Sequence, residues 1–116
     1  MANEDKRDTE KVAVMVHFYH LREQEHTDVV IRNIVRKGFR PLRISDLKST
    51  AIKRQCIRKR GEVLVMLGTR IRLTNGKFWT VCIPISTTKI GPFFTPHDRT
   101  WGRKWCFPAI PDQRKR

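Results

Sequence analysis

The chain has 116 residues, of which 25 are Lys or Arg and 11 are Asp or Glu, giving a formal net charge of +14. Its hydrophobic fraction of 39% is enough for one small folded domain and excludes a chain that is disordered throughout. No apolar run is long enough to span a membrane, and we expect neither a signal peptide nor a membrane partner. A charge of this size predicts an anionic partner, either nucleic acid or an acidic protein.

The positive charge is concentrated in the later part of the chain. Residues 1–28 hold four Lys or Arg and seven Asp or Glu, a net charge of −3, whereas residues 29–116 hold 21 and four, a net charge of +17; the two sum to +14. We predict a flexible acidic and polar lead-in over 1–10, a compact domain over 11–85 and an irregular aromatic and basic tail over 86–116. The tail would either pack on the domain or bind a partner.

Apolar periodicity and turn residues indicate the secondary structure. Strand-like alternation and helical spacing both occur, and glycines and prolines mark the breaks. In chain order, the expected elements are a strand over 11–21, a helix from His26 or Thr27 to Gly38, an extended segment over 39–45, a second helix from Ser49 or Thr50 to about Arg60, a buried strand over 62–67, and a hairpin around Asn75-Gly76 whose second strand ends near Pro84.

The order of these elements, β-α-β-α-β-β-β, predicts the fold class. It is typical of a small single α+β domain in which two helices cover one side of a mainly antiparallel sheet. The main alternative is a small β-barrel built on residues 62–85 with helical decoration.

The dipeptide Asn75-Gly76 predicts a type I′ turn, because both central residues of that turn need a positive φ. A two-residue loop also fixes the register and would place Arg72 opposite Trp79. A face that combines cations with a large ring suits a nucleic-acid strand, although the Arg72–Trp79 pair could also serve only to stabilise the hairpin. The expected core face comprises Ile71, Leu73, Phe78, Thr80 and Cys82, and the expected open face comprises Arg70, Arg72, Thr74, Lys77, Trp79 and Val81.

The second predicted helix and the segment before it form the densest cluster of cations. Six cations occur within thirteen residues without one acid, although a plain solvated surface normally mixes both signs. Phosphate contact is the favoured interpretation, and a nuclear localisation signal is compatible with it. The cluster consists of Lys48, Lys53, Arg54, Arg58, Lys59 and Arg60.

Aromatic and cationic side chains are interleaved in the predicted tail between Arg99 and Phe107. This pattern is typical of a platform on which single-stranded bases stack. Two other interpretations stay open: the rings could lock an irregular segment onto the domain, or they could dock onto a protein partner. The candidate contact residues are Arg99, Trp101, Arg103, Lys104 and Trp105.

The cysteines Cys56, Cys82 and Cys106 are widely spaced, which indicates free thiols in the cytoplasm or nucleus rather than a disulfide framework. Neither a CxxC nor an HExxH motif occurs, and His17 and His20 would face opposite sides of the first strand. We therefore expect no metal site and no cofactor. No close pair of acids, phosphate loop or nucleophile elbow indicates an enzyme.

The sequence thus predicts a non-catalytic nucleic-acid-binding protein, with RNA or single strands favoured, that acts as a small regulatory factor. In composition the chain resembles small basic regulatory proteins of viruses, without a shared motif. One alternative is an adaptor that binds a host or partner protein through the Trp- and Pro-rich tail, and another is a structural nucleoprotein component. The expected contact residues are Lys53, Arg54, Arg58, Lys59, Arg60, Arg70, Arg72, Lys77, Trp79, Arg99, Trp101, Arg103, Lys104 and Trp105.

Overall fold

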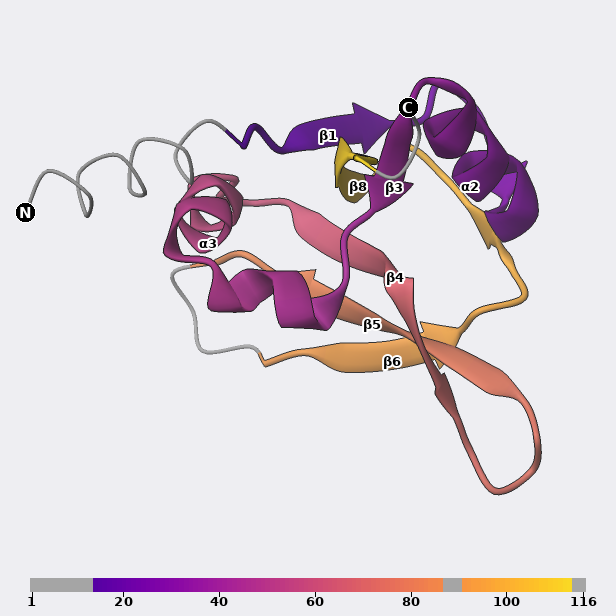
Figure 1. The fold of residues 1–116 in the computed structure, drawn as a ribbon. Coiled ribbons are helices and arrows are strands. Elements are labelled where there is room, and N and C mark those ends of the chain that lie inside the picture. Colours follow the sequence, from indigo (N-terminus) through magenta and orange to yellow (C-terminus); the bar gives the residue numbers. More distant parts are fainter. Residues whose placement is uncertain (1–13, 87–90, 114–116) are drawn as a thin grey trace, which may run out of the picture.

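The computed structural model describes residues 14–86 and 91–113 (Figure 1). The predicted lead-in, residues 1–10, lies outside the described residues. The helices are α2 (Thr27–Arg36), the 3-10 helix η1 (Ile44–Lys48) and α3 (Thr50–Ile57). The strands are β1 (His17–His20), β2 (Glu25–His26), β3 (Phe39–Pro41), β4 (Val63–Arg72), β5 (Phe78–Pro84), β6 (Phe93–Pro96), β7 (Thr100–Trp101) and β8 (Trp105–Pro111).

Strand β8 is an interior strand of the main sheet, whose order is β1-β8-β4-β5-β6, and it has three partner strands. It pairs antiparallel with β1 along one edge, and along the other it pairs parallel with β4 and antiparallel with β3. Its residues 105–110 are all buried. A small second sheet joins β2 to β7.

The prediction of an irregular tail over 86–116 is wrong, because this segment contains β6, β7 and the interior strand β8. Pro108 and Pro111 argue against a strand in the sequence, because proline is rare inside sheets. Pro108 has no N–H to donate, but its carbonyl accepts a hydrogen bond from the Leu42 N–H at 3.0 Å. The strand therefore tolerates a proline that sequence reasoning treated as a breaker.

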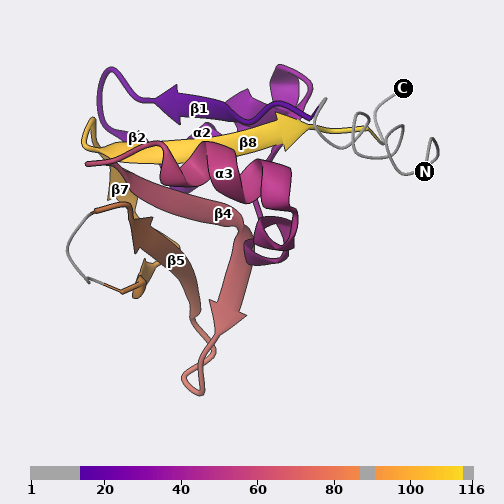
Figure 2. The same ribbon diagram turned by 90° about the vertical axis from the view of Figure 1, so that its left-hand side faces the viewer.

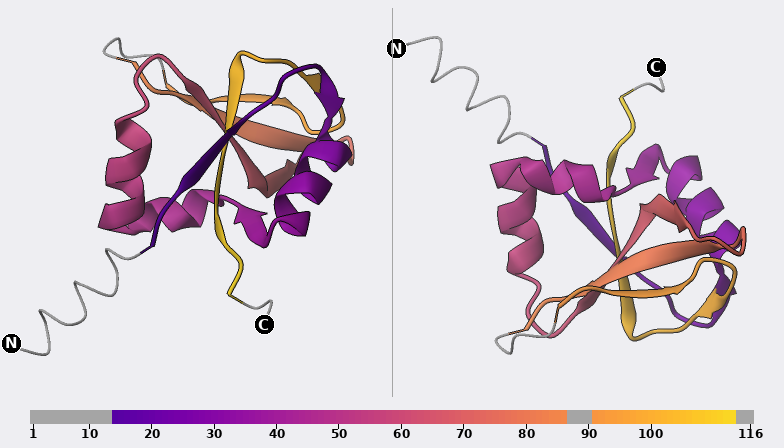
Figure 3. Two further views of the ribbon diagram at one scale, coloured as in Figure 1. Left: turned by 90° about the horizontal axis from the view of Figure 1, so that it is seen from above. Right: turned by 90° about the horizontal axis from the view of Figure 1, so that it is seen from below.

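The two α-helices lie on opposite faces of the sheet (Figure 3), and the prediction that they share one side is wrong. On one face, Val30 and Ile34 of α2 pack in a core with Val65 of β4. On the other face, Ile52 of α3 packs in a second core with Leu64 of β4. Neighbouring residues of a strand point to opposite faces, so β4 contributes to both cores. Its near-continuous apolar run is the pattern of a strand covered on both sides.

Both helices begin at a side-chain cap. The helix α2 follows His26, whose imidazole accepts a hydrogen bond from a backbone N–H of the first turn at 3.3 Å. Gly38, just beyond its end, has a φ of 90°, as predicted for the left-handed residue that terminates a helix. The helix α3 follows Ser49, whose hydroxyl caps it at 3.3 Å, but it ends at Ile57 rather than near Arg60.

The main sheet stays open, since β1 and β6 are its end strands and do not pair with each other. The barrel alternative is therefore wrong. A small single domain with α2 and α3 packed on a mostly antiparallel sheet is confirmed, and the chain order of the elements agrees with the prediction. Among the described residues, no helix combines the length and the apolar character needed to cross a membrane.

Candidate nucleic-acid interface

A hairpin arm extends from the body of the domain beyond an irregularity in β4 (Figure 1). Met66 pairs with Val81 and Arg70 pairs with Thr80, so three residues of β4 have no opposite residue in β5. A bulge of this kind bends the strand and increases its twist. The bulge therefore sets the direction in which the arm leaves the sheet.

Gly68 lies inside this bulge, where another part of the backbone approaches closely. Its N–H donates to the Leu42 carbonyl at 3.0 Å. A Cβ atom at this position would lie 2.6 Å from the Pro41 carbonyl oxygen and 2.7 Å from that of Leu42. Backbone oxygens cannot rotate away as a flexible side chain can, so the contact requires glycine.

The arm ends in a three-residue loop, and the predicted type I′ turn is wrong. The Gly76 N–H donates to the Leu73 carbonyl at 2.9 Å, and the Leu73 N–H donates to the Lys77 carbonyl at 3.0 Å. Gly76 has a φ of 81°, whereas Asn75 has a negative φ, as in a type I turn followed by a left-handed glycine. The longer loop shifts the strand register by one residue.

The shifted register changes which ring lies beside the arginines. Arg72 lies opposite Phe78, and Ile71 lies opposite Trp79. The Arg70 guanidinium lies 4.6 Å from the centroid of the Phe78 ring, and Phe78 is 39% exposed. The predicted faces are therefore wrong: Phe78 was assigned to the core, and Trp79 to the face of the arginines. An exposed ring beside a guanidinium is a surface that a nucleic-acid strand can use.

Trp79 is partly buried, and its indole N–H has no hydrogen-bond partner among the described residues. It lines a cavity of about 480 Å³ beside the arm, together with Lys77, Phe78 and His97. Burial, followed by the nearby charge of Arg70, lowers the pKa of His97 below its usual value. The charged side chains that line this cavity are therefore Lys77 and Asp98, so its lining carries both signs.

A second group of exposed cations lies on η1 and α3, and Figure 2 shows α3 in front of the sheet. Its cations are exposed except Lys59, which is partly buried with its ammonium 4.9 Å from the centroid of the Phe18 ring. None of them forms an ion pair with a carboxylate of the described residues. Asp46, the single acid between residues 43 and 60, is bound by Arg40 through two contacts of 2.9 Å. This α3 basic surface consists of Arg43, Lys48, Lys53, Arg54, Arg58, Lys59 and Arg60.

The segment η1 lies between β3 and α3 in the chain and contacts the base of the hairpin arm. The Ile44 N–H donates to the hydroxyl of Thr69 in the bulge at 2.9 Å. Arg43 therefore lies at the base of the arm. It was absent from the predicted contact residues, although its position in a segment with one acid could have indicated it.

The predicted stacking platform is part of the core. Trp101 is 0% exposed, and its indole N–H donates to the Thr27 hydroxyl at 2.6 Å. Trp105 is buried against it, with 5.1 Å between the ring centroids. The guanidinium of Arg99 lies 4.5 Å and 5.1 Å from the centroids of these two rings. Neither ring is open to a base, so the stacking role expected for them is wrong. The exposed cations of this segment are Arg103 and Lys104.

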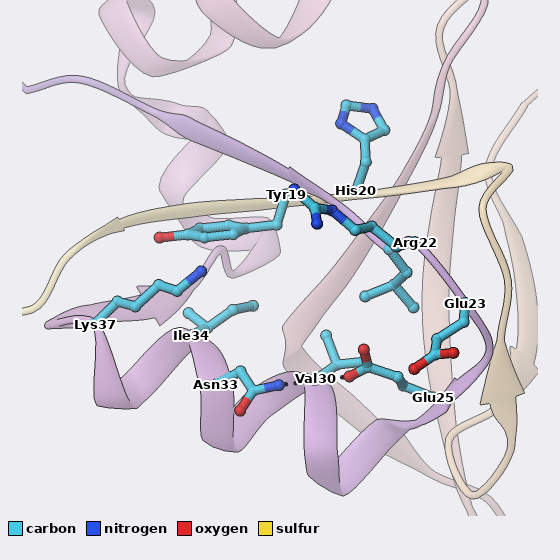
Figure 4. A pocket seen from close by; sticks show the side chains of 10 residues that line it. Tyr19, His20, Arg22, Glu23, Glu25, Val30, Asn33, Ile34 and Lys37 are labelled. Carbon is cyan, nitrogen blue, oxygen red and sulfur yellow. Dashed lines mark hydrogen bonds between the residues drawn. The ribbon is translucent and has the colours of Figure 1, made fainter.

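A smaller cavity of about 250 Å³ lies between the end of β1 and α2 (Figure 4). Val30 and Ile34 line it together with Tyr19, and the Lys37 ammonium lies 5.2 Å from the centroid of the Tyr19 ring. The lining also includes Glu25, whose carboxylate accepts a hydrogen bond from a neighbouring amide at 3.4 Å. Its charged lining is mixed, with Glu23 and Glu25 beside Arg22 and Lys37, and it lies away from both basic surfaces, so we do not include it in the proposed interface.

The three cysteines are buried core residues with protonated thiols. Burial raises the pKa of Cys56 and of Cys82 to about 11, and that of Cys106 to about 12. A thiol in this state is a weak nucleophile at neutral pH. These side chains therefore act as small apolar groups in the free protein.

Of the predicted contact residues, the structure leaves two exposed basic groups in place, one on α3 and one on the hairpin arm, and moves Trp101 and Trp105 into the core. It adds Phe78 as the ring that accompanies the arginines of the arm. No protein-family model, no curated protein and no solved structure matches the chain.

Proposed function

We propose that the chain is a non-catalytic nucleic-acid-binding protein that prefers RNA or single strands and acts as a small regulatory factor. The α3 basic surface carries this proposal. Seven cations lie along η1 and α3, and the one acid of that segment is already bound by Arg40. Exposed like charges repel one another, and a polyanion relieves that repulsion while it releases its condensed counterions.

The hairpin arm supports the preference for single strands. Phe78 has an exposed ring beside Arg70. Any unpaired base can stack on such a ring, whereas a base inside a duplex cannot reach it. Phosphate contacts carry no sequence information, so we expect little sequence specificity. Base stacking on the arm and phosphate contacts on α3 together suit RNA loops and single strands better than duplex DNA.

The other two candidate functions differ in what they need from the surface. An adaptor that binds through the Trp- and Pro-rich tail needs exposed anchor rings, and the burial of Trp101 and Trp105 removes two of them. A structural nucleoprotein would use the same phosphate contacts. It would also self-assemble as its concentration rises, which a regulatory factor need not do.

Fluorescence anisotropy of labelled single-stranded RNA, duplex RNA and duplex DNA, titrated across a salt series, tests the proposal. We expect the single-stranded RNA to bind most tightly. The logarithm of the binding constant should fall linearly with the logarithm of salt concentration, because each phosphate contact releases a counterion. Weak binding of all three probes at moderate salt would overturn the proposal.

A pair of matched double variants locates the interface. Replacing Arg54 and Arg58 of α3 by Gln removes two phosphate contacts and should reduce the salt slope by about 1.4 on single strands. Replacing Arg32 and Arg36 of α2 removes the same charge from equally exposed positions on the opposite face. That control should leave the slope nearly unchanged. Equal effects of both variants would remove α3 from the interface and leave only a general effect of net charge.

A further inference from the structure

Three potential metal ligands from distant parts of the chain lie together on the sheet face that α3 covers. They are His20, Glu62 and Cys106, and one ligand atom of each lies within 4.8 Å of the other two. The His20 Nε2 atom lies 3.0 Å from Glu62 Oε1. Cys106 is fully buried in the core that also contains Ile52 of α3.

Strand pairing brings these side chains to one face. His20 of β1 lies opposite Cys106 of β8, and Cys106 lies opposite Leu64 of β4. Glu62 precedes Leu64 by two residues, the spacing at which side chains of an extended segment share a face. Figure 4 shows the His20 ring pointing away from Tyr19 and from the helix that carries Ile34, although His20 also lines the edge of the cavity drawn there.

We propose that His20, Glu62 and Cys106 form a binding site for a divalent transition-metal ion, with Zn²⁺ as the best fit. Imidazole nitrogen, thiolate sulfur and carboxylate oxygen are the three ligand types that zinc uses in proteins, whereas Mg²⁺ and Ca²⁺ prefer oxygen alone. Three protein ligands leave a fourth tetrahedral position for water. The His20 and Glu62 side chains are 42% and 33% exposed, which gives the ion a path from solvent.

The charges of the filled site balance. As the metal–sulfur bond forms, the Cys106 thiol loses its proton to solvent, and the resulting thiolate and the Glu62 carboxylate neutralise the two charges of the ion. His20 binds as a neutral imidazole and keeps its second nitrogen for a hydrogen bond. Ligand atoms around a tetrahedral zinc are about 3.5 Å apart. The His20 and Glu62 side chains, which are in contact at 3.0 Å, would therefore separate slightly from each other and move toward the Cys106 sulfur.

Lys59 is the charge that opposes metal binding. It lies near enough to Cys106 for their charges to interact. Its charge favours the Cys106 thiolate but repels the dication. Because the filled site carries one more positive charge than the empty site, the repulsion is the larger effect. Replacing Lys59 by Met keeps most of the apolar side chain and should tighten metal binding several-fold. If the three side chains only pack against one another and bind no metal, Lys59→Met should leave the metal affinity unchanged.

Titration of the reduced protein with Co²⁺ tests the proposal, because a thiolate ligand gives cobalt an intense near-ultraviolet charge-transfer band. We expect this band in the wild type, its displacement by Zn²⁺, and its loss in Cys106→Ser. His20→Asn and Glu62→Gln should each weaken binding at least tenfold. These two positions are partly exposed, so the variants stay informative where the serine variant fails to fold.

Cys82→Ser is the matched control, because Cys82 is equally buried but packs in the other core. It should keep the cobalt band. Absence of the band in the wild type, its survival in Cys106→Ser, or equal binding by wild type and His20→Asn would each overturn the proposal. Lys59 is shared with the α3 basic surface, but none of the three metal ligands is a proposed phosphate contact, so the ligand variants test the metal site separately from the nucleic-acid interface.

Discussion

The hairpin arm and the segment from β7 through β8 have similar local sequences, but the arm is exposed to solvent and the segment is buried. Both combine aromatic rings with Arg and Lys, yet Phe78 on the arm is 39% exposed, whereas Trp101 and Phe107 are 0% exposed. Strand β8 has three partner strands and is covered by a helix on each face. The arm extends past the bulge, away from both helices (Figure 1). Interleaved rings and cations therefore indicate a stacking surface only where strand pairing leaves them exposed.

The largest expected effect separates the two regions by stability. Trp101→Ala removes a fully buried ring and its hydrogen bond to Thr27, and should lower the free energy of unfolding by about 3–5 kcal/mol. Phe78→Ala removes an exposed ring and a cation–π contact, and should cost no more than about 1 kcal/mol. Urea unfolding of both variants measures the difference. Similar losses would mean that the arm is part of the core after all.

The bulge that bends the arm away from the sheet should depend on Gly68. Gly68→Ala places a Cβ atom against two backbone oxygens and should destabilise the fold by about 1–3 kcal/mol. Gly91→Ala is the matched control, because a Cβ atom there meets no atom within 4 Å. Thermal unfolding of the two variants checks this expectation. A neutral Gly68→Ala would show that the bulge can relax without cost.

Phe78, which contributes little to stability, should matter most for RNA binding. Phe78→Ala is expected to weaken single-stranded RNA binding by about 1–3 kcal/mol, because a base loses its stacking partner. Phe94→Ala serves as control, since Phe94 is 57% exposed on β6 and has no cation–π contact among the described residues. Anisotropy at one salt concentration measures both. An equal loss in the control would exclude a specific stacking site on the arm.

The smallest expected effect is a pH dependence of stability at the base of the arm. Burial holds the pKa of His97 below its ordinary value of about 6.5, so the unfolded chain takes up a proton first as pH falls. The contribution of His97 is complete above the unfolded pKa and is lost as pH falls toward the folded pKa. His97→Gln should remove this loss in urea unfolding at neutral and mildly acidic pH. The same pH dependence in both proteins would assign it to other groups.

The sequence predicts the features that depend on near neighbours. His26, Ser49 and Gly38 mark helix ends through contacts within one turn, and the cations of α3 follow from composition alone. Asn75-Gly76 predicts a hairpin, but Gly76 fits both a two-residue and a three-residue loop. The loop length sets the register, and the three-residue loop places Phe78 instead of Trp79 opposite Arg72.

Features that depend on distant strands could not be predicted. The pairing of His17 with Ala109 joins segments that no local pattern relates, and the burial of Trp101 follows from that pairing. The approach of His20 to Cys106 has the same origin, because spacing rules for metal sites search near neighbours in sequence.

The position of β8 in the chain determines when the protein can fold. Within the described residues, β8 is the only strand partner of β1 and β3, and it follows both of them in the chain by more than sixty residues. Until residue 111 has been synthesised, both earlier strands wait without hydrogen-bond partners. Pairing over such sequence separations is slow, so the sheet can assemble only after β8 has been synthesised. The nascent chain must therefore stay soluble until β8 is available.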